Sequence, residues 1–66
     1  MDDTDELIIQ LCTRVGMIME DACMVALSIG RVEHEARQAE LGKLEMAADR
    51  IAALLQAAKA LLTEVS

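Results

Sequence analysis

The sequence of 66 residues contains no proline, phenylalanine, tyrosine or tryptophan, and only three glycines. Proline is the strongest helix breaker, and its absence leaves long helices uninterrupted. Strands favour aromatic and β-branched residues, whereas the alanine, leucine, methionine, glutamate, glutamine and arginine that are abundant here favour helices. The composition therefore predicts an all-α fold.

Positive charge is also scarce, with six lysine and arginine residues against twelve acidic ones and a formal net charge of −6. Nucleic-acid binders usually present a basic face to the phosphate backbone, and single-strand binders stack bases on aromatic side chains. This chain has neither feature. We therefore expect no direct binding to nucleic acid.

Long uncharged runs are missing as well, although 55% of the residues are hydrophobic. No stretch approaches the roughly 18 apolar residues that span a bilayer. The acidic start, Met1-Asp-Asp-Thr-Asp-Glu6, is the opposite of the basic start of a signal peptide. We expect a cytoplasmic protein without membrane contact, whose cysteines stay reduced.

The first half of the chain carries an apolar residue at every third or fourth position, which predicts a helix over about 4–33. This first seam consists of Ile8, Leu11, Val15, Ile18, Ala22, Val25, Ile29 and Val32. A second row beside it widens the apolar arc beyond the stripe of a two-stranded coil: Ile9, Cys12, Gly16, Met19, Cys23, Ala26 and Gly30. A glycine in mid-helix costs about 1 kcal/mol relative to alanine, so Gly16 indicates a close approach by another helix.

The second half has the same spacing and predicts a helix over about 41–65. Its seam is Leu41, Leu44, Ala48, Ile51, Leu55, Ala58, Leu62 and Val65, flanked by Ala47, Leu54 and Leu61. The two patterns are out of phase, because extending the second backward would put His34 and Arg37 at core positions. This favours a turn within 33–42, with Gly30 and Gly42 as candidate helix caps. One long continuous helix in a coiled coil is the alternative.

A single hairpin domain of this size cannot bury its own apolar surface. Such a chain buries about 60% of the surface that it exposes when unfolded, and small helical scaffolds often supplement their core by oligomerising. We expect a homodimer that forms an antiparallel four-helix bundle. The residues predicted to carry self-association are Ile8, Leu11, Val15, Gly16, Ile18, Ala22, Val25, Ile29, Leu44, Ala48, Ile51, Leu55 and Leu62.

Met17 and Met24 stand one heptad apart on the otherwise polar face of the first helix. Exposed methionines form adaptable contacts for partner helices, so they are candidates for contact with a different protein; packing at the edge of the bundle core is the favoured interpretation. We expect a non-enzymatic interaction or regulatory module. A subunit that needs another protein is the alternative, since the chain resembles the small hairpin co-chaperones of secretion systems in length and layout.

The two cysteines lie about three helical turns, or about 16 Å, apart on one helix. Cys12 and Cys23 therefore cannot form a disulfide within one straight helix. A crosslink between subunits, or a Cu(I) site with Met19, would be the functional interpretation. The favoured interpretation is that both cysteines act as small hydrophobic residues. We therefore predict no metal and no cofactor.

The segment His34-Glu-Ala-Arg37 resembles the phosphorylated segment of histidine phosphotransfer domains, in which a basic residue follows the histidine three positions later on a four-helix bundle. The resemblance covers two residues and lacks the glycine that normally follows the basic position. It implies phosphotransfer through His34; a solvated histidine near the turn is the favoured interpretation. Because no nucleophile, base and orienting group can be assembled, we expect no catalytic residues.

Overall fold

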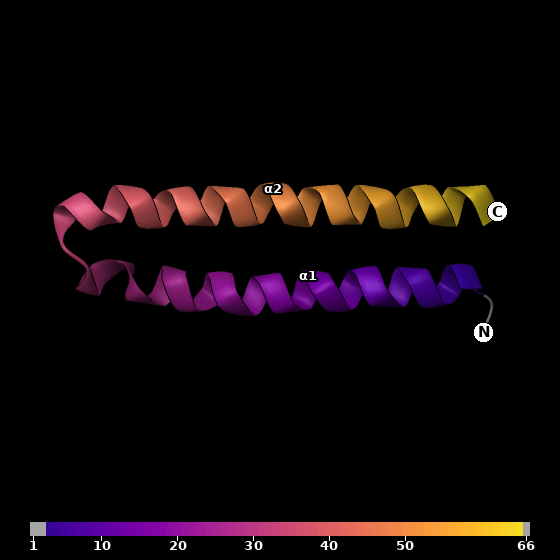
Figure 1. Ribbon diagram of the computed structural model, residues 1–66, viewed down its shortest axis with the longest axis horizontal. Coiled ribbons are helices and arrows are strands. Elements are labelled where there is room, and N and C mark those ends of the chain that lie inside the picture. Colours follow the sequence, from indigo (N-terminus) through magenta and orange to yellow (C-terminus); the bar gives the residue numbers. More distant parts are fainter. Residues whose placement is uncertain (1–2, 66) are drawn as a thin grey trace.

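The computed structural model describes residues 3–65, and the side chains of 3–63. All secondary structure in this range is helical: α1 spans Asp3–Ser28, the short 3-10 helix η1 spans Ile29–Arg31, and α2 spans His34–Val65. The two long helices lie side by side and run in opposite directions (Figure 1). The all-α prediction is confirmed, and the layout is a helical hairpin rather than one continuous helix.

Acidic residues mark the beginning of α1. Asp3, Asp5 and Glu6 all lie in its first turn. The unpaired N–H groups of a helix start carry partial positive charge, so carboxylates stabilise this end. The acidic start of the sequence therefore has a local structural role.

The chain reverses at Val32 and Glu33. Val32 has an extended backbone, with φ −90° and ψ 156°, and the Glu33 carbonyl accepts hydrogen bonds from the N–H groups of Ala36 and Arg37 at 2.9 and 3.1 Å. Among the described residues no glycine has a positive φ, so neither candidate cap adopts the left-handed conformation. The first helix instead ends through the 3-10 turn and the extended valine.

The second helix begins earlier than its predicted start near residue 41. The segment 34–41 contains no glycine or proline and consists mainly of good helix formers. Once the chain has reversed at Val32, nothing in this segment stops helix propagation. The connection therefore lies at the N-terminal end of the range 33–42 that the sequence favoured. As a result α2 is the longer of the two helices.

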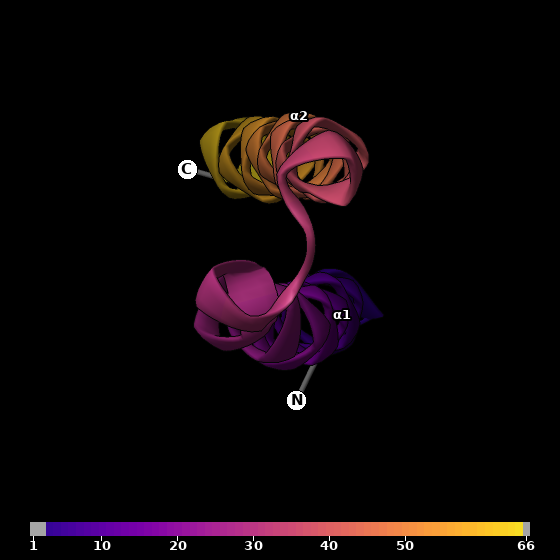
Figure 2. The same cartoon turned by 90° about the vertical axis from the view of Figure 1, so that its left-hand side faces the viewer.

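The hairpin has almost no interior of its own. Val15, at 7% exposure, is the only buried residue among those described. Seen end-on, the two helices form a single layer (Figure 2), with extents of 48 × 16 × 10 Å. The radius of gyration is 15.3 Å, against about 11 Å for a compact domain of this length. The described hairpin is therefore a single layer of two helices with almost no buried core.

Candidate self-association surface

The inward face of α1 is the one that the sequence predicts. Every residue of the first seam is buried or partly buried, and α1, which holds all of them except Ile29 in η1 and Val32 in the connection, packs against α2. Within this chain the seam therefore packs one helix against the other. Its members are Ile8, Leu11, Val15, Ile18, Ala22, Val25, Ile29 and Val32.

The inward face of α2 differs from its predicted seam by a rotation of the helix. Leu44, Ile51 and Ala58 are partly buried as expected, but the positions between them are filled by the flanking residues Ala47, Leu54 and Leu61. The other predicted seam residues with described side chains are exposed: Leu41, Ala48, Leu55 and Leu62. Val65 lies at the end of α2, and its side chain is outside the described residues. The helix thus has two adjacent apolar rows that share every second member, and only one of them faces α1.

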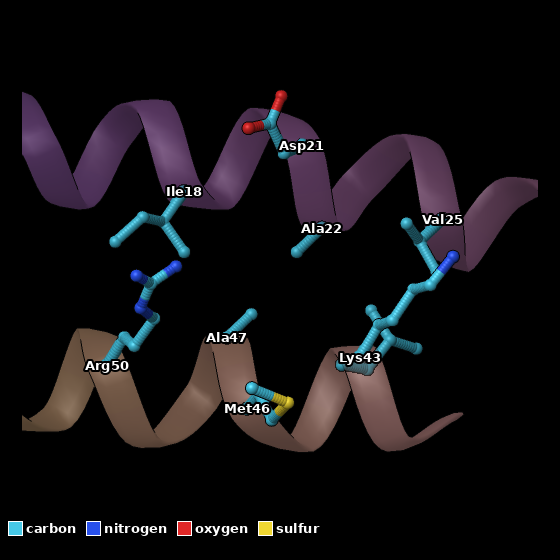
Figure 3. Close-up of a pocket in the computed structure, with 9 residues that line it drawn as sticks. Ile18, Asp21, Ala22, Val25, Lys43, Met46, Ala47 and Arg50 are labelled. Carbon is cyan, nitrogen blue, oxygen red and sulfur yellow. The ribbon is translucent and has the colours of Figure 1, made fainter. Parts of the chain in front are cut away.

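The pairing of the two helices can be read at Ala22, which faces Ala47 (Figure 3). Counting outward in opposite directions from this pair matches each inward residue of α1 with an inward residue of α2. The resulting pairs are Ile18 with Ile51, Val15 with Leu54, Leu11 with Ala58, and Ile8 with Leu61. One register therefore aligns the inward residues of α1 from Ile8 to Val25 with those of α2 from Leu44 to Leu61.

The hairpin has two flat sides with different chemistry. Because the helices are antiparallel, residues that directly precede inward positions lie on one side, and residues that directly follow them lie on the other. We call the first the charged side: it comprises Leu7, Gln10, Arg14, Met17, Asp21, Met24, Ser28, Arg31, Ala39, Lys43, Met46, Arg50, Ala53, Ala57 and Ala60. We call the second the apolar side: it comprises Ile9, Cys12, Gly16, Met19, Cys23, Ala26, Gly30, Leu41, Glu45, Ala48, Ala52, Leu55, Lys59 and Leu62.

The charged side has a cavity of about 260 Å³ between the helices. Asp21 of α1 and Lys43 and Arg50 of α2 line it together, which places these charges on the same side of the hairpin (Figure 3). The Lys43 ammonium donates a hydrogen bond of 2.9 Å to the Glu40 carboxylate. These lysine and arginine heads are exposed, so the charges remain solvated on this side.

The apolar side is exposed along its whole length. Its larger side chains include Ile9, Met19 and Leu55, which are 48%, 51% and 43% exposed. The α1 part carries no charge between residues 9 and 30, and the α2 part carries one acid and one base. A Cβ added at Gly16 would meet nothing within 4 Å, so the hairpin itself does not require a glycine there.

The two methionines that are candidates for contact with a different protein lie on the charged side. Met17 and Met24 are 62% and 72% exposed. Met24 also lines a second opening of about 270 Å³ with Leu27, Ser28 and Arg31. Their role as a contact remains a prediction, but both thioethers are accessible to a partner.

The remaining candidates for chemistry are separate from one another. Cys12 and Cys23 are free thiols, and both are exposed on the apolar side rather than buried within the hairpin. His34 is exposed at the first residue of α2. Across residues 3–63 no three histidine, cysteine or acidic side chains gather into a group that could hold a metal ion.

Two further observations bear on the class of protein. Neither described helix is long and apolar enough to cross a membrane. Comparison with known families, with curated proteins and with solved structures found no match to this chain. The function is therefore argued from the two sides of the hairpin.

Proposed function

We propose that the chain is a small, non-enzymatic interaction module that self-associates through its apolar side, so that two hairpins form a four-helix bundle. The observation that carries the proposal is the contrast between the two sides. Both lie beside the same inward seam, but one offers a row of solvated charges and the other a row of exposed Ile, Met, Cys, Ala and Leu. A second layer of helices is best accommodated on the side with few charges to desolvate.

The exposed area agrees with this arrangement. The isolated hairpin exposes 5386 Å², whereas a compact monomer of its mass exposes about 4,100 Å². The excess exceeds the roughly 800 Å² that each partner buries in a stable interface of standard size. One apolar side per chain is large enough for such an interface.

Packing of a second copy also completes the core. In the hairpin alone, one buried side chain cannot offset the conformational entropy lost by more than 60 ordered residues. A second hairpin on the apolar side would cover the inward seam from that side as well. The seam residues and the exposed Gly16, Ala48, Leu55 and Leu62 would then belong to one bundle interior, as the sequence analysis expects.

The charged side stays outside this bundle. We propose that it is the surface available to a different protein, with Met17 and Met24 as contacts between the surrounding charges. We also place the module in the cytoplasm, where the thiols of the apolar side would remain reduced. Its regulatory role would then depend on a partner that binds the dimer from outside.

Two methionines on opposite sides of the hairpin test the proposal with the same substitution. Met19 is 51% exposed on the apolar side, and Met46 is 66% exposed on the charged side. Met19→Glu should raise the dimer dissociation constant at least about 100-fold, because each dimer would have to desolvate two new carboxylates. Met46→Glu should change it by less than about 3-fold, since its carboxylate stays in water beside Lys43 and Arg50.

Sedimentation velocity over a dilution series, with circular dichroism on the same samples, measures both effects. Equal dissociation constants for the two variants would contradict self-association through the apolar side. A folded monomer for the unmodified chain would contradict self-association altogether, and recovery of a complex with a different protein would then identify the other occupant of this side.

A further inference from the structure

We infer that the two hairpins are related by a two-fold axis perpendicular to the helices, which passes between Gly16 and Met19 of the two α1 helices. This packs α1 against α1 and α2 against α2 in antiparallel pairs and puts Cys12 of one copy opposite the partner's Cys23. The inference rests on the proposed self-association and adds its direction and register. Each helix of the hairpin gives this direction and register separately, and both give the same axis.

The α1 row on the apolar side is symmetric about its own midpoint. Antiparallel alignment there sets Ile9 against the partner's Ala26, Cys12 against the partner's Cys23, and Gly16 against the partner's Met19. A shift of one heptad in one direction sets Asp5 against the partner's Cys23. A shift in the other direction leaves Ile9 opposite the partner's Glu33, beyond the end of α1. In the midpoint register each residue of the row from Ile9 to Ala26 faces another residue of that row, and Asp5 lies opposite the partner's Gly30, beyond the last residue of α1.

This register explains why a glycine occupies position 16. Nothing within the hairpin lies within 4 Å of an added Cβ at this position, yet the glycine weakens the helix by about 1 kcal/mol relative to alanine. Opposite the partner's Met19, the missing side chain lets the helices approach closely, and the flexible thioether fills the space above the glycine. The pair occurs twice, once on each side of the axis.

The α2 helix gives the same axis independently. In the register set by Ala22 and Ala47, the midpoint between Gly16 and Met19 lies opposite the point between Ile51 and Ala52. The exposed row of α2 is symmetric about this same point. It sets Leu41 against the partner's Leu62 and Ala48 against the partner's Leu55, and it puts the small Ala52 at the axis.

Charge distinguishes this arrangement from its main alternative. About the same axis, Glu45 lies beside the partner's Lys59, so the acid and the base of the apolar side pair twice in the dimer. If α1 packed instead on the partner's α2, both charges would face the uncharged α1 row between residues 9 and 30. Desolvating two charges without partners disfavours that packing.

The two exposed thiols allow a direct test with a short bis-maleimide joined by an ethylene linker, in which each ring adds one thiol. In the unmodified chain the reagent should join Cys12 to the partner's Cys23. Cys12→Ser and Cys23→Ser should each remove the covalent dimer, because the remaining thiols of the two copies lie about 16 Å apart along the bundle. Unfolding the two variants together and refolding them as a mixture should restore crosslinking, in the heterodimers that contain one thiol of each kind.

Light scattering on the serine variants keeps this inference separate from the proposed function. Dimeric variants that crosslink only in the mixture support the register. Crosslinking within either variant alone, or none in a mixture of dimeric variants, overturns the register and leaves self-association standing. Monomeric variants, together with a monomeric unmodified chain, overturn both.

Discussion

The two sides of this hairpin are formed by the same two helices. On each helix, the residues of one side directly precede the inward residues, and those of the other side directly follow them. Methionine occurs on both sides, as Met19 on one and Met17, Met24 and Met46 on the other. The number of charges differs: the charged side carries Arg14, Asp21, Arg31, Lys43 and Arg50, although alanines occupy it on α2 after Arg50. The apolar side carries Glu45 and Lys59 on α2 and no charge from Ile9 to Ala26 on α1. In a molecule of one layer, the placement of a few charges decides where a second layer can pack.

The largest effect should come from a charge placed in the middle of the apolar side. Leu55→Glu should weaken the dimer by about 3 kcal/mol or more, since two carboxylates would lose water on association. Leu27→Glu is the matched control, because Leu27 is 76% exposed on the outer surface of α1. Sedimentation equilibrium of both variants gives the difference. Similar association by the two would show that the apolar side is not the interface.

A cavity at Val15 should have the next largest effect. Val15→Ala removes two methyl groups from the one buried residue of the described chain and should lower the free energy of unfolding by about 2 kcal/mol. Val25→Ala, at a partly exposed position of the same seam, should cost less. Urea unfolding followed by circular dichroism at fixed protein concentration compares them. A loss at Val15 below that at Val25 would mean that the seam does not centre on Val15.

Leucine substitutions at the two mid-helix glycines should have opposite effects on stability. An added Cβ meets nothing within 4 Å of Gly16 or of Gly42 in the hairpin. Gly42→Leu should therefore stabilise by up to about 1 kcal/mol through helix propensity. Gly16→Leu should weaken the dimer by about 1 to 2 kcal/mol despite the same propensity gain, because it separates α1 from the partner's helix. Equal stabilisation by both substitutions would remove the argument for a close approach at Gly16.

Reversal of the charges on the apolar side should give the smallest effect. Glu45→Lys and Lys59→Glu should each weaken the dimer by about 1 kcal/mol or less, because the pairs lie at the edge of the interface. The double swap should restore most of the loss, and added salt should reduce all three differences. Dissociation constants measured at low and high salt test this. If the double variant dimerised as weakly as either single variant, Glu45 would not lie beside the partner's Lys59.

The sequence predicted α1 closely and α2 in part, for one physical reason. On α1 the inward seam contains branched residues such as Val15 and Ile18, whereas the adjacent row contains smaller ones such as Gly16. On α2 two equally apolar rows share Leu44 and Ile51, so periodicity alone cannot decide which row faces α1. The turn was poorly marked because it uses an extended Val32 in place of a glycine or proline.

The second apolar row of α2 is also part of the surface that we propose for self-association. The predicted seam residues Ala48, Leu55 and Leu62 turn out to be exposed on the apolar side, next to the inward row. A helix that only had to pair with α1 would need one apolar row. The second row of α2, like the second row of α1, is exposed in the described hairpin, and we propose that a second copy covers both rows.

The central claim is tested most directly by the solution mass of the unmodified chain, measured by light scattering with refractive-index detection because the sequence has no tyrosine or tryptophan. Circular dichroism on the same sample reports whether the helices are formed. The account predicts a helical species of twice the 7.2 kDa chain mass. A fully helical species of 7.2 kDa that persists at high concentration would contradict it.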